Sequence, residues 1–347
     1  MKRTNIIIVF SLLTIVVLST GYFLIKSANK NNTGNYLGSD YEGNYVWGGA
    51  MNLAWNDLNE NILGEKLELN TEERIALDMV EKFNDAVFEK TDLDEKSYYI
   101  KSGYGQETID LINQESRKKF PTKSFPDLVS KLGPTEIISY AYLLKEVEYL
   151  VQFKETNVKF KNTDVKGFYA QSSEDKKNVK IVKYWNDNKF IISLQLKDKK
   201  DKLFLAKGFD MTSPQYIVEK INKYNNENNT EIIGENDIFK MPKISLDHNR
   251  SYEELINKLI ANKNFEEYFI GKMLERIKFD MDHKGARVEN EAFIFVPSIG
   301  IGMKYKVPKR KEFVLDKPFW IVMKRANSNN PYFILGVNNE NIMERVK

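Results

Sequence analysis

The chain has 347 residues, of which 42% are hydrophobic and 29% charged, and its formal net charge at pH 7 is +3. It can bury a sizeable core as one large domain or two smaller ones. Residues 1–30 hold four basic residues and no acid, so residues 31–347 sum to −1. A nearly neutral chain gives no electrostatic reason to bind nucleic acid. The absence of cysteine excludes a disulfide framework and a lipoprotein anchor.

The amino terminus has the pattern of a membrane segment. Residues 5–25, NIIIVFSLLTIVVLSTGYFLI, are uncharged and follow Lys2 and Arg3. About 20 apolar residues span a bilayer, and a basic amino end favours an orientation with that end in the cytoplasm. We predict an uncleaved signal anchor over 1–26, with the rest of the chain outside the cytoplasm. A cleaved signal peptide, which would give a secreted protein, is the alternative.

A flexible linker and then helices are predicted next. Residues 27–43, SANKNNTGNYLGSDYEG, are small and polar, which is typical of a spacer. The apolar face of a helix over 71–90 is predicted to contain Ile75, Met79, Val80, Phe83, Val87 and Phe88. Further helices are predicted over 106–119, from the Ser213-Pro214 cap to about 226, and over 251–262, where Ser251 and Glu254 form a capping box.

Strands dominate the remaining segments. Period-two or continuous apolar patterns predict strands within 136–210, 237–247, 274–296 and 312–339. Helices mainly in the amino half, followed by strands, predict an α+β fold with a large central, mostly antiparallel sheet.

Motifs for catalysis or metal binding are absent from the sequence. There are two histidines, His248 and His283, and no H-E-x-x-H, G-x-S-x-G or P-loop pattern. We expect His248 to be a solvated turn residue. Ser116 and Lys119 match a serine–lysine pattern, but they lie on a polar helix without its partner motifs. We predict that the protein is not an enzyme and binds no metal or cofactor. A membrane-anchored enzyme stays as an alternative to the functions considered below.

The carboxyl third carries a set of spaced motifs. His283-Lys284 leads to Asn290-Glu291, then to Lys317-Pro318-Phe319, WIVMKRANSNNPYFIL and Val337-Asn338-Asn339. This order and spacing resemble those of the serpins, a family of serine protease inhibitors. In that family the first two motifs mark the start and the end of a central strand. A long exposed reactive loop comes next, and the later motifs lie in the buried hairpin that follows the loop.

Upstream segments follow the same family order. FKMPKISLDHNRSYEELINKL, VKYWNDNKFIISLQLKD, YAYLLKEVEYLVQFKETNVKF and NYVWGGAMNLAWNDL each look like a serpin segment, so the resemblance covers most of a domain at 44–347. The stretch 59–135 is short for the family, which implies that some peripheral helices are missing. Gly48-Gly49 replace serines that lie, in serpins, under the central sheet at the point where it opens. Tyr140 replaces an asparagine of the family. The resemblance places His283 at that same junction.

The resemblance also implies a hinge and a scissile region. Glu291 would end the central strand, and the hinge would continue through Phe293, Ile294, Phe295, Val296 and Pro297. Inhibitory serpins insert this segment into the sheet after cleavage and fill it with small residues. Here the bulky side chains would overpack the sheet and Pro297 would lose a ladder hydrogen bond.

The scissile position would be Val307, followed by Pro308, with cuts after Lys306, Lys309 or Arg310 as alternatives. The basic run 304–311 could also contact anionic polymers or be a solvated loop. The resemblance implies an extracytoplasmic inhibitor of serine-type endopeptidases whose hinge is poorly suited to insertion. The alternative is a non-inhibitory surface protein of the same fold that binds another ligand.

Overall fold

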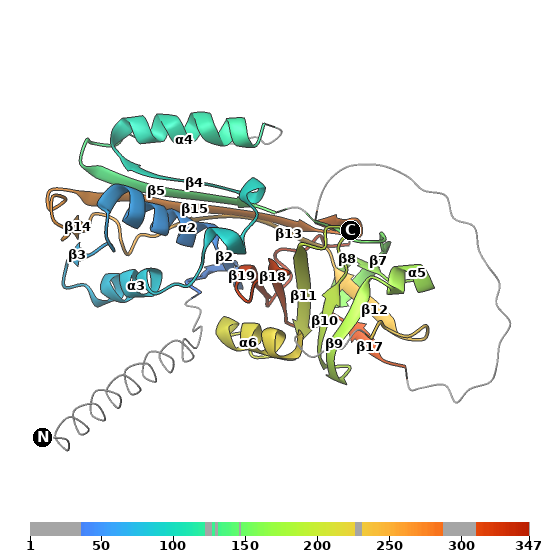
Figure 1. The fold of residues 1–347 in the computed structure, drawn as a ribbon. Helices are drawn as coiled ribbons and strands as arrows, with labels where there is room; N and C mark the ends of the chain where they lie inside the picture. Colours follow the sequence, from blue (N-terminus) through green and yellow to red (C-terminus); the bar gives the residue numbers. More distant parts are fainter. Residues whose placement is uncertain are drawn as a thin grey trace, which may run out of the picture. The chain divides into compact units, whose positions relative to one another are not determined.

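The computed structural model shows an α+β fold (Figure 1), as the sequence predicts. It describes residues 36–121, 127–128, 131–145, 147–225, 231–286 and 310–346. Within these ranges no helix is both long and apolar enough to cross a membrane. The predicted anchor at 5–25 lies outside the described residues.

The largest sheet is antiparallel and is buried through its centre. In spatial order its strands are β1 (Ser39–Tyr41), β2 (Asn44–Gly48), β19 (Pro331–Val337), β18 (Phe319–Arg325), β11 (Asp201–Lys207), β10 (Lys189–Leu194) and β9 (Val179–Asn186). Every residue of β19 and all of β18 except Arg325 are buried. Continuous apolar runs such as these are typical of strands that are covered on both faces.

A second sheet contains a parallel pair of strands. In spatial order its strands are β3 (Leu69–Asn70), β14 (Leu259–Ile260), β15 (Phe269–Met281), β5 (Glu136–Leu144) and β4 (Tyr98–Tyr104), and β13 (Ile244–Ser251) also pairs with β15. β15 and β5 run parallel, and the other pairs of this sheet among the described residues are antiparallel. We call the β15–β5 junction the β5–β15 seam.

Two smaller sheets complete the strand content. The first has the order β17 (Glu312–Val314), β12 (Ile238–Pro242), β8 (Thr163–Tyr169) and β7 (Lys154–Phe160), and the second pairs β16 (Gly285–Ala286) with β6 (Val147–Glu148). The single strand predicted over 237–247 is therefore wrong. It divides at Pro242–Lys243 into β12 and β13, which belong to different sheets, and a proline is expected at a strand end because it has no N–H to donate.

Helices lie on both faces of the sheet that holds the seam (Figure 1). The α-helices are α2 (Ala50–Asp57), α3 (Arg74–Asn84), α4 (Gly105–Lys119), α5 (Ser173–Lys176) and α6 (Pro214–Asn225), with η1 (Leu58–Leu63), η2 (Lys90–Asp92) and η3 (Glu95–Ser97) as π or 3-10 turns. α4 packs on β4 and β5 from one side and α2 from the other. α4 and α6 confirm the helices predicted over 106–119 and 213–226, and Ser213 Oγ accepts a hydrogen bond from Tyr216 N at 3.3 Å.

Two predicted helices need correction. The helix predicted over 71–90 is limited to α3, and Ile75 and Val87 from its predicted apolar face are 69% and 41% exposed. The helix predicted over 251–262 does not form. β13 continues its pairing with β15 as far as Ser251, turns follow, and Tyr252 and Leu255 are buried. Sheet pairing and burial override a helical preference, which is worth only roughly 0.5 kcal/mol per residue.

The linker prediction fails for its second half. Residues 27–35 lie outside the described residues, but 36–43 pack on the body. β1 pairs with β2, Tyr36 makes an edge contact with Trp47 at 4.8 Å between ring centroids, and the Tyr45 hydroxyl donates to Tyr36 O at 3.1 Å. The aromatic residues in this polar stretch provide apolar area for burial, which composition alone does not indicate.

Candidate functional site

The β5–β15 seam is a parallel junction inside its sheet, and the directions of its strands decide how an additional strand would pair there. β15 runs towards Met281, so a chain that leaves it and turns back would run antiparallel to β15. Because β5 is parallel to β15, the returning strand would also be antiparallel to β5. Opening the seam would thus exchange one parallel pair for two antiparallel pairs, which are slightly more stable per residue.

The layer beneath the seam is tightly packed around the junction of β2 and α2. A Cβ atom on Gly48 would lie 3.0 Å from Ile277 Cδ1, 3.1 Å from Leu143 Cδ2 and 3.2 Å from Glu275 Oε1. One on Gly49 would lie 2.3 Å from the ring of Phe88. The structure therefore places Gly48 under both strands of the seam, where a larger side chain would have to displace them.

Glu275 is a buried acid on the inward face of β15. The strand alternates, so Glu275 faces inward with Met273, Ile277 and Phe279 and is 4% exposed. The Tyr252 hydroxyl donates to its Oε2 at 2.9 Å, while Oε1 faces the first turn of α2, near Met51, without a well-formed hydrogen bond. Burial raises the pKa of Glu275 from 4.5 to about 7, against the opposing effects of Tyr252 and Arg250.

Glu275 is not among the site residues predicted from the sequence, although the sequence contains a signal for it. In FIGKMLERIKFDM the period of two predicts an apolar residue at every second position from Met273 to Met281, and Glu275 breaks that pattern. A residue that violates the local pattern often marks a functional or strained position.

A chain of contacts joins Glu275 to the amino-terminal segment. The guanidinium of Arg250 lies 3.9 Å from the ring centre of Tyr252 and donates to the carbonyl oxygen of Leu37. One residue pair further along β13, His248 Nε2 and Ser39 Oγ share a hydrogen bond of 2.7 Å. His248 is 8% exposed, so the expectation of a solvated turn residue is wrong. Residues 36–41 are thereby attached to the strand next to β15.

Tyr140 and His283 do not lie with the glycines. Tyr140 pairs with Leu274 across the seam and packs on the α4 side, where its ring centroid is 6.1 Å from that of Tyr99. His283 follows β15 in a turn, its Nδ1 is 3.3 Å from Glu155 Oε1, and burial lowers its pKa. The predicted cluster is therefore wrong. β15 ends at Met281, and the turn closed by Asp282 N and Gly285 O carries the His-Lys pair away from the seam.

The predicted hinge and scissile residues are mostly outside the described part of the chain. This applies to Glu291, Phe293, Ile294, Pro297, Lys306, Val307, Pro308 and Lys309. Arg310 is described; it is exposed and donates to Glu312 Oε1 at 3.0 Å just before β17. Across the described ranges, no cluster of three or more His, Asp or Glu side chains could hold a metal ion.

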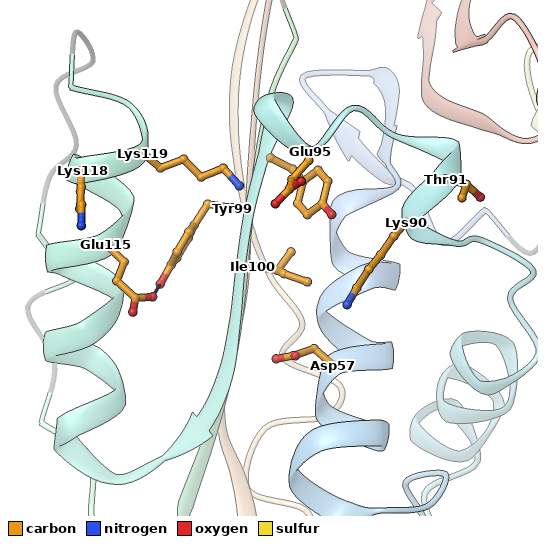
Figure 2. Close-up of a pocket in the computed structure, with 10 residues that line it drawn as sticks. Asp57, Lys90, Thr91, Glu95, Tyr99, Ile100, Glu115, Lys118 and Lys119 are labelled. Atoms are coloured by element: carbon orange, nitrogen blue, oxygen red, sulfur yellow. Dashed lines mark hydrogen bonds between the residues drawn. The ribbon is translucent and has the colours of Figure 1, made fainter.

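A cavity of about 800 Å³ lies beside β4, the edge strand of the seam's sheet (Figure 2). Figure 2 shows side chains from α4, β4, α2 and the η2–η3 segment around it, with the Tyr99 hydroxyl donating to Glu115 Oε2 at 2.9 Å. The charged residues of its wall are Asp57, Glu95 and Glu115 with Lys90, Lys118 and Lys119. Because these charges balance, the wall does not select an anion or a cation, and we assign no ligand to it.

Comparison with solved structures identifies the fold. Serpin48, a highly specific serpin of the insect Tenebrio molitor, matches with a TM-score of 0.51 at 11% identity, over 84% of this chain and 91% of that one. The mouse protein-Z dependent protease inhibitor gives 0.55 at 13% identity over 86% and 91%. Tengpin, a thermophilic serpin in its native state, gives 0.52 at 13% identity over 87% and 90%.

The chain therefore has the serpin fold, as the motif spacing in its carboxyl third suggests. No family model matches its sequence, and no curated protein sequence matches it.

Proposed function

We propose that this chain is an extracytoplasmic serpin-fold protein that binds a serine-type endopeptidase through the segment 287–309 without trapping it covalently. The observation that carries the proposal is the packing at the β5–β15 seam. A Cβ atom added to Gly48 would lie 3.0–3.2 Å from side-chain atoms of both strands, closer than an ordinary contact, so the layer below the seam is tightly packed at this point.

A trap would require residues from 293 onward to enter this seam as a strand. Alternate side chains of that strand would face the Gly48 layer, and each bulky residue would overpack it at a cost of about 1–3 kcal/mol. Phe293, Ile294, Phe295 and Val296 are all bulky, and Pro297 would leave a ladder carbonyl unpaired. Insertion must outpace hydrolysis of the acylated protease, so such costs favour release.

The segment 287–309, which would be the bait for the protease, retains features of a protease substrate. Lys306, Lys309 and Arg310 suit a protease specific for basic residues, whereas the Val307–Pro308 bond is a poor substrate because a tertiary amide restricts the approach. The apolar run 5–25 supports a location outside the cytoplasm, with the membrane as a partner through that run.

A non-inhibitory binding protein of the same fold is the second candidate. It is favoured by Gly48 and Gly49, which stand where the inhibitory family has serines, and by the departure of His283 from the seam. In this case the segment 287–309 would not be a bait at all.

The test uses the full-length protein and a panel of trypsin-like and subtilisin-like proteases. We expect cleavage near Lys306–Arg310, no denaturant-resistant adduct on gels, and no large rise in melting temperature after the cut. A matched variant with Phe293, Phe295 and Pro297 all changed to alanine should gain some adduct if the hinge is the obstacle. A stable adduct with the unchanged protein would refute the hinge argument. Absence of both binding and loop cleavage would favour the second candidate.

A further inference from the structure

A second cavity, of about 710 Å³, has a strongly basic wall. It opens between the carboxyl end of α6 and the strands β9, β10 and β11. Four of its lining residues are lysines, Lys177, Lys180, Lys199 and Lys202, and its one acid is Asp201. The Asp201 carboxylate is already held by Lys145 at 2.9 Å and by Arg325 at 3.2 Å, so it does not neutralise the lysines of the wall.

Among the residues that the structure describes, three of these lysines have no carboxylate partner. Lys177 is paired with Glu174, but Lys180, Lys199 and Lys202 form no ion pair with a described residue. The carboxyl end of α6 supplies roughly half an elementary negative charge, which is too little to balance three ammonium groups. Counting only the described residues, the wall therefore keeps an uncompensated positive charge.

A buried lysine adds to this charge from the neighbouring strand. Lys324 of β18 pairs directly with Lys202 of β11, so the two side chains lie on the same face of the sheet. Lys324 is 2% exposed, and the partner of its ammonium is the amide oxygen of Asn222 at 2.7 Å. Burial, and then Lys202, lower its pKa to about 8. Directly opposed like charges destabilise a sheet, and a buried ammonium without a carboxylate costs more.

This arrangement is not a general consequence of a lysine-rich chain. The cavity beside β4 in Figure 2 is of similar size and has three lysines, but three acids line it with them, whereas the basic cavity has four lysines and one acid. The basic cavity also offers the Ser193 hydroxyl and the side-chain amides of Gln195 and Asn225 as donors. Its volume lies within the range of about 300–1,000 Å³ that is typical of small-molecule sites.

We propose that this cavity binds a small molecule with clustered phosphoryl groups. Lysine ammonium groups bind phosphate as point charges, and two or more phosphoryl groups would supply the negative charge that Lys180, Lys199 and Lys202 lack. The ligand would also relieve the repulsion between Lys202 and Lys324. The site does not involve the β5–β15 seam, so it is independent of the proposed function.

The test is calorimetric titration of the full-length protein with tripolyphosphate at about 150 mM salt, where weak surface binding is screened. We expect one site per chain. Lys202→Gln should weaken binding about tenfold or more, because a charge-assisted hydrogen bond is lost. Lys159→Gln is the matched control, since Lys159 is an exposed lysine of β7 away from the cavity, and it should leave affinity unchanged.

Lys324→Met separates binding from folding. It should raise the melting temperature without ligand, because a buried charge without a carboxylate is removed, and it should weaken tripolyphosphate binding less than Lys202→Gln does, because Lys324 does not line the cavity. Equal affinity of the Lys202 and Lys159 variants, or no binding to the unchanged protein at millimolar tripolyphosphate, would overturn the proposal. Binding of inorganic sulfate as tightly as tripolyphosphate would also overturn it, because clustered phosphoryl groups would then have no advantage.

Discussion

Replacing Glu275 by glutamine should stabilise the protein at neutral and alkaline pH. Glutamine keeps the size of the side chain and an oxygen that can accept from the Tyr252 hydroxyl, but it removes the charge. The pKa of Glu275 is raised from 4.5 to about 7 in the folded protein, so ionising it there costs about 3 kcal/mol more than in the unfolded chain.

The sign follows from which state holds the proton. Below about pH 4.5 both states are protonated and the charge has no cost. Between about 4.5 and 7 the folded protein keeps a proton that the unfolded chain has lost, so the free energy of unfolding falls as the pH rises. Above about 7 the full cost remains.

Urea unfolding of the full-length protein and of Glu275→Gln, from about pH 4.5 to 8, measures this difference. The gain of the variant should grow by about 3 kcal/mol over that range. Glu266→Gln, which changes an exposed glutamate of the same chain, should show no comparable growth. A gain that is equal at both ends of the range would show that Glu275 does not titrate as its burial requires.

Two further substitutions test the packing around the same core. Gly48→Val should lower the free energy of unfolding by about 1–3 kcal/mol, because its side chain would overlap with Ile277 and Leu143, and urea unfolding measures it. Asp201→Asn should destabilise the protein by about 3 kcal/mol, because Lys145, which is 7% exposed, would lose its buried partner. If Lys145→Met combined with Asp201→Asn is no more stable than Asp201→Asn alone, the ion pair is not the cause.

The amino-acid sequence by itself determined the elements whose pattern is local. α4 and α6 follow from their apolar spacing and, for α6, from the Ser213 cap, and the strands β18 and β19 follow from continuous apolar runs. The order of these elements and the motifs from Lys317 to Asn339 were enough to indicate the serpin fold. Each of these features depends on residues that are neighbours in the chain, so no knowledge of distant contacts is needed.

Only the tertiary structure decided where distant segments meet. The motif order placed His283 at the seam, but the pairing of β15 with β5 puts Leu274 opposite Tyr140 and brings Glu275 under the sheet instead. Residues 251–262 lost a local helical preference to sheet pairing with β15 at Ser251 and Leu259. The basic cavity depends on lysines from different strands, such as Lys180 of β9 and Lys202 of β11, which the seven-stranded sheet brings to one cavity. Strand register is fixed by which side chains can be buried against segments far away in the chain, and a pattern of neighbouring residues does not contain that information.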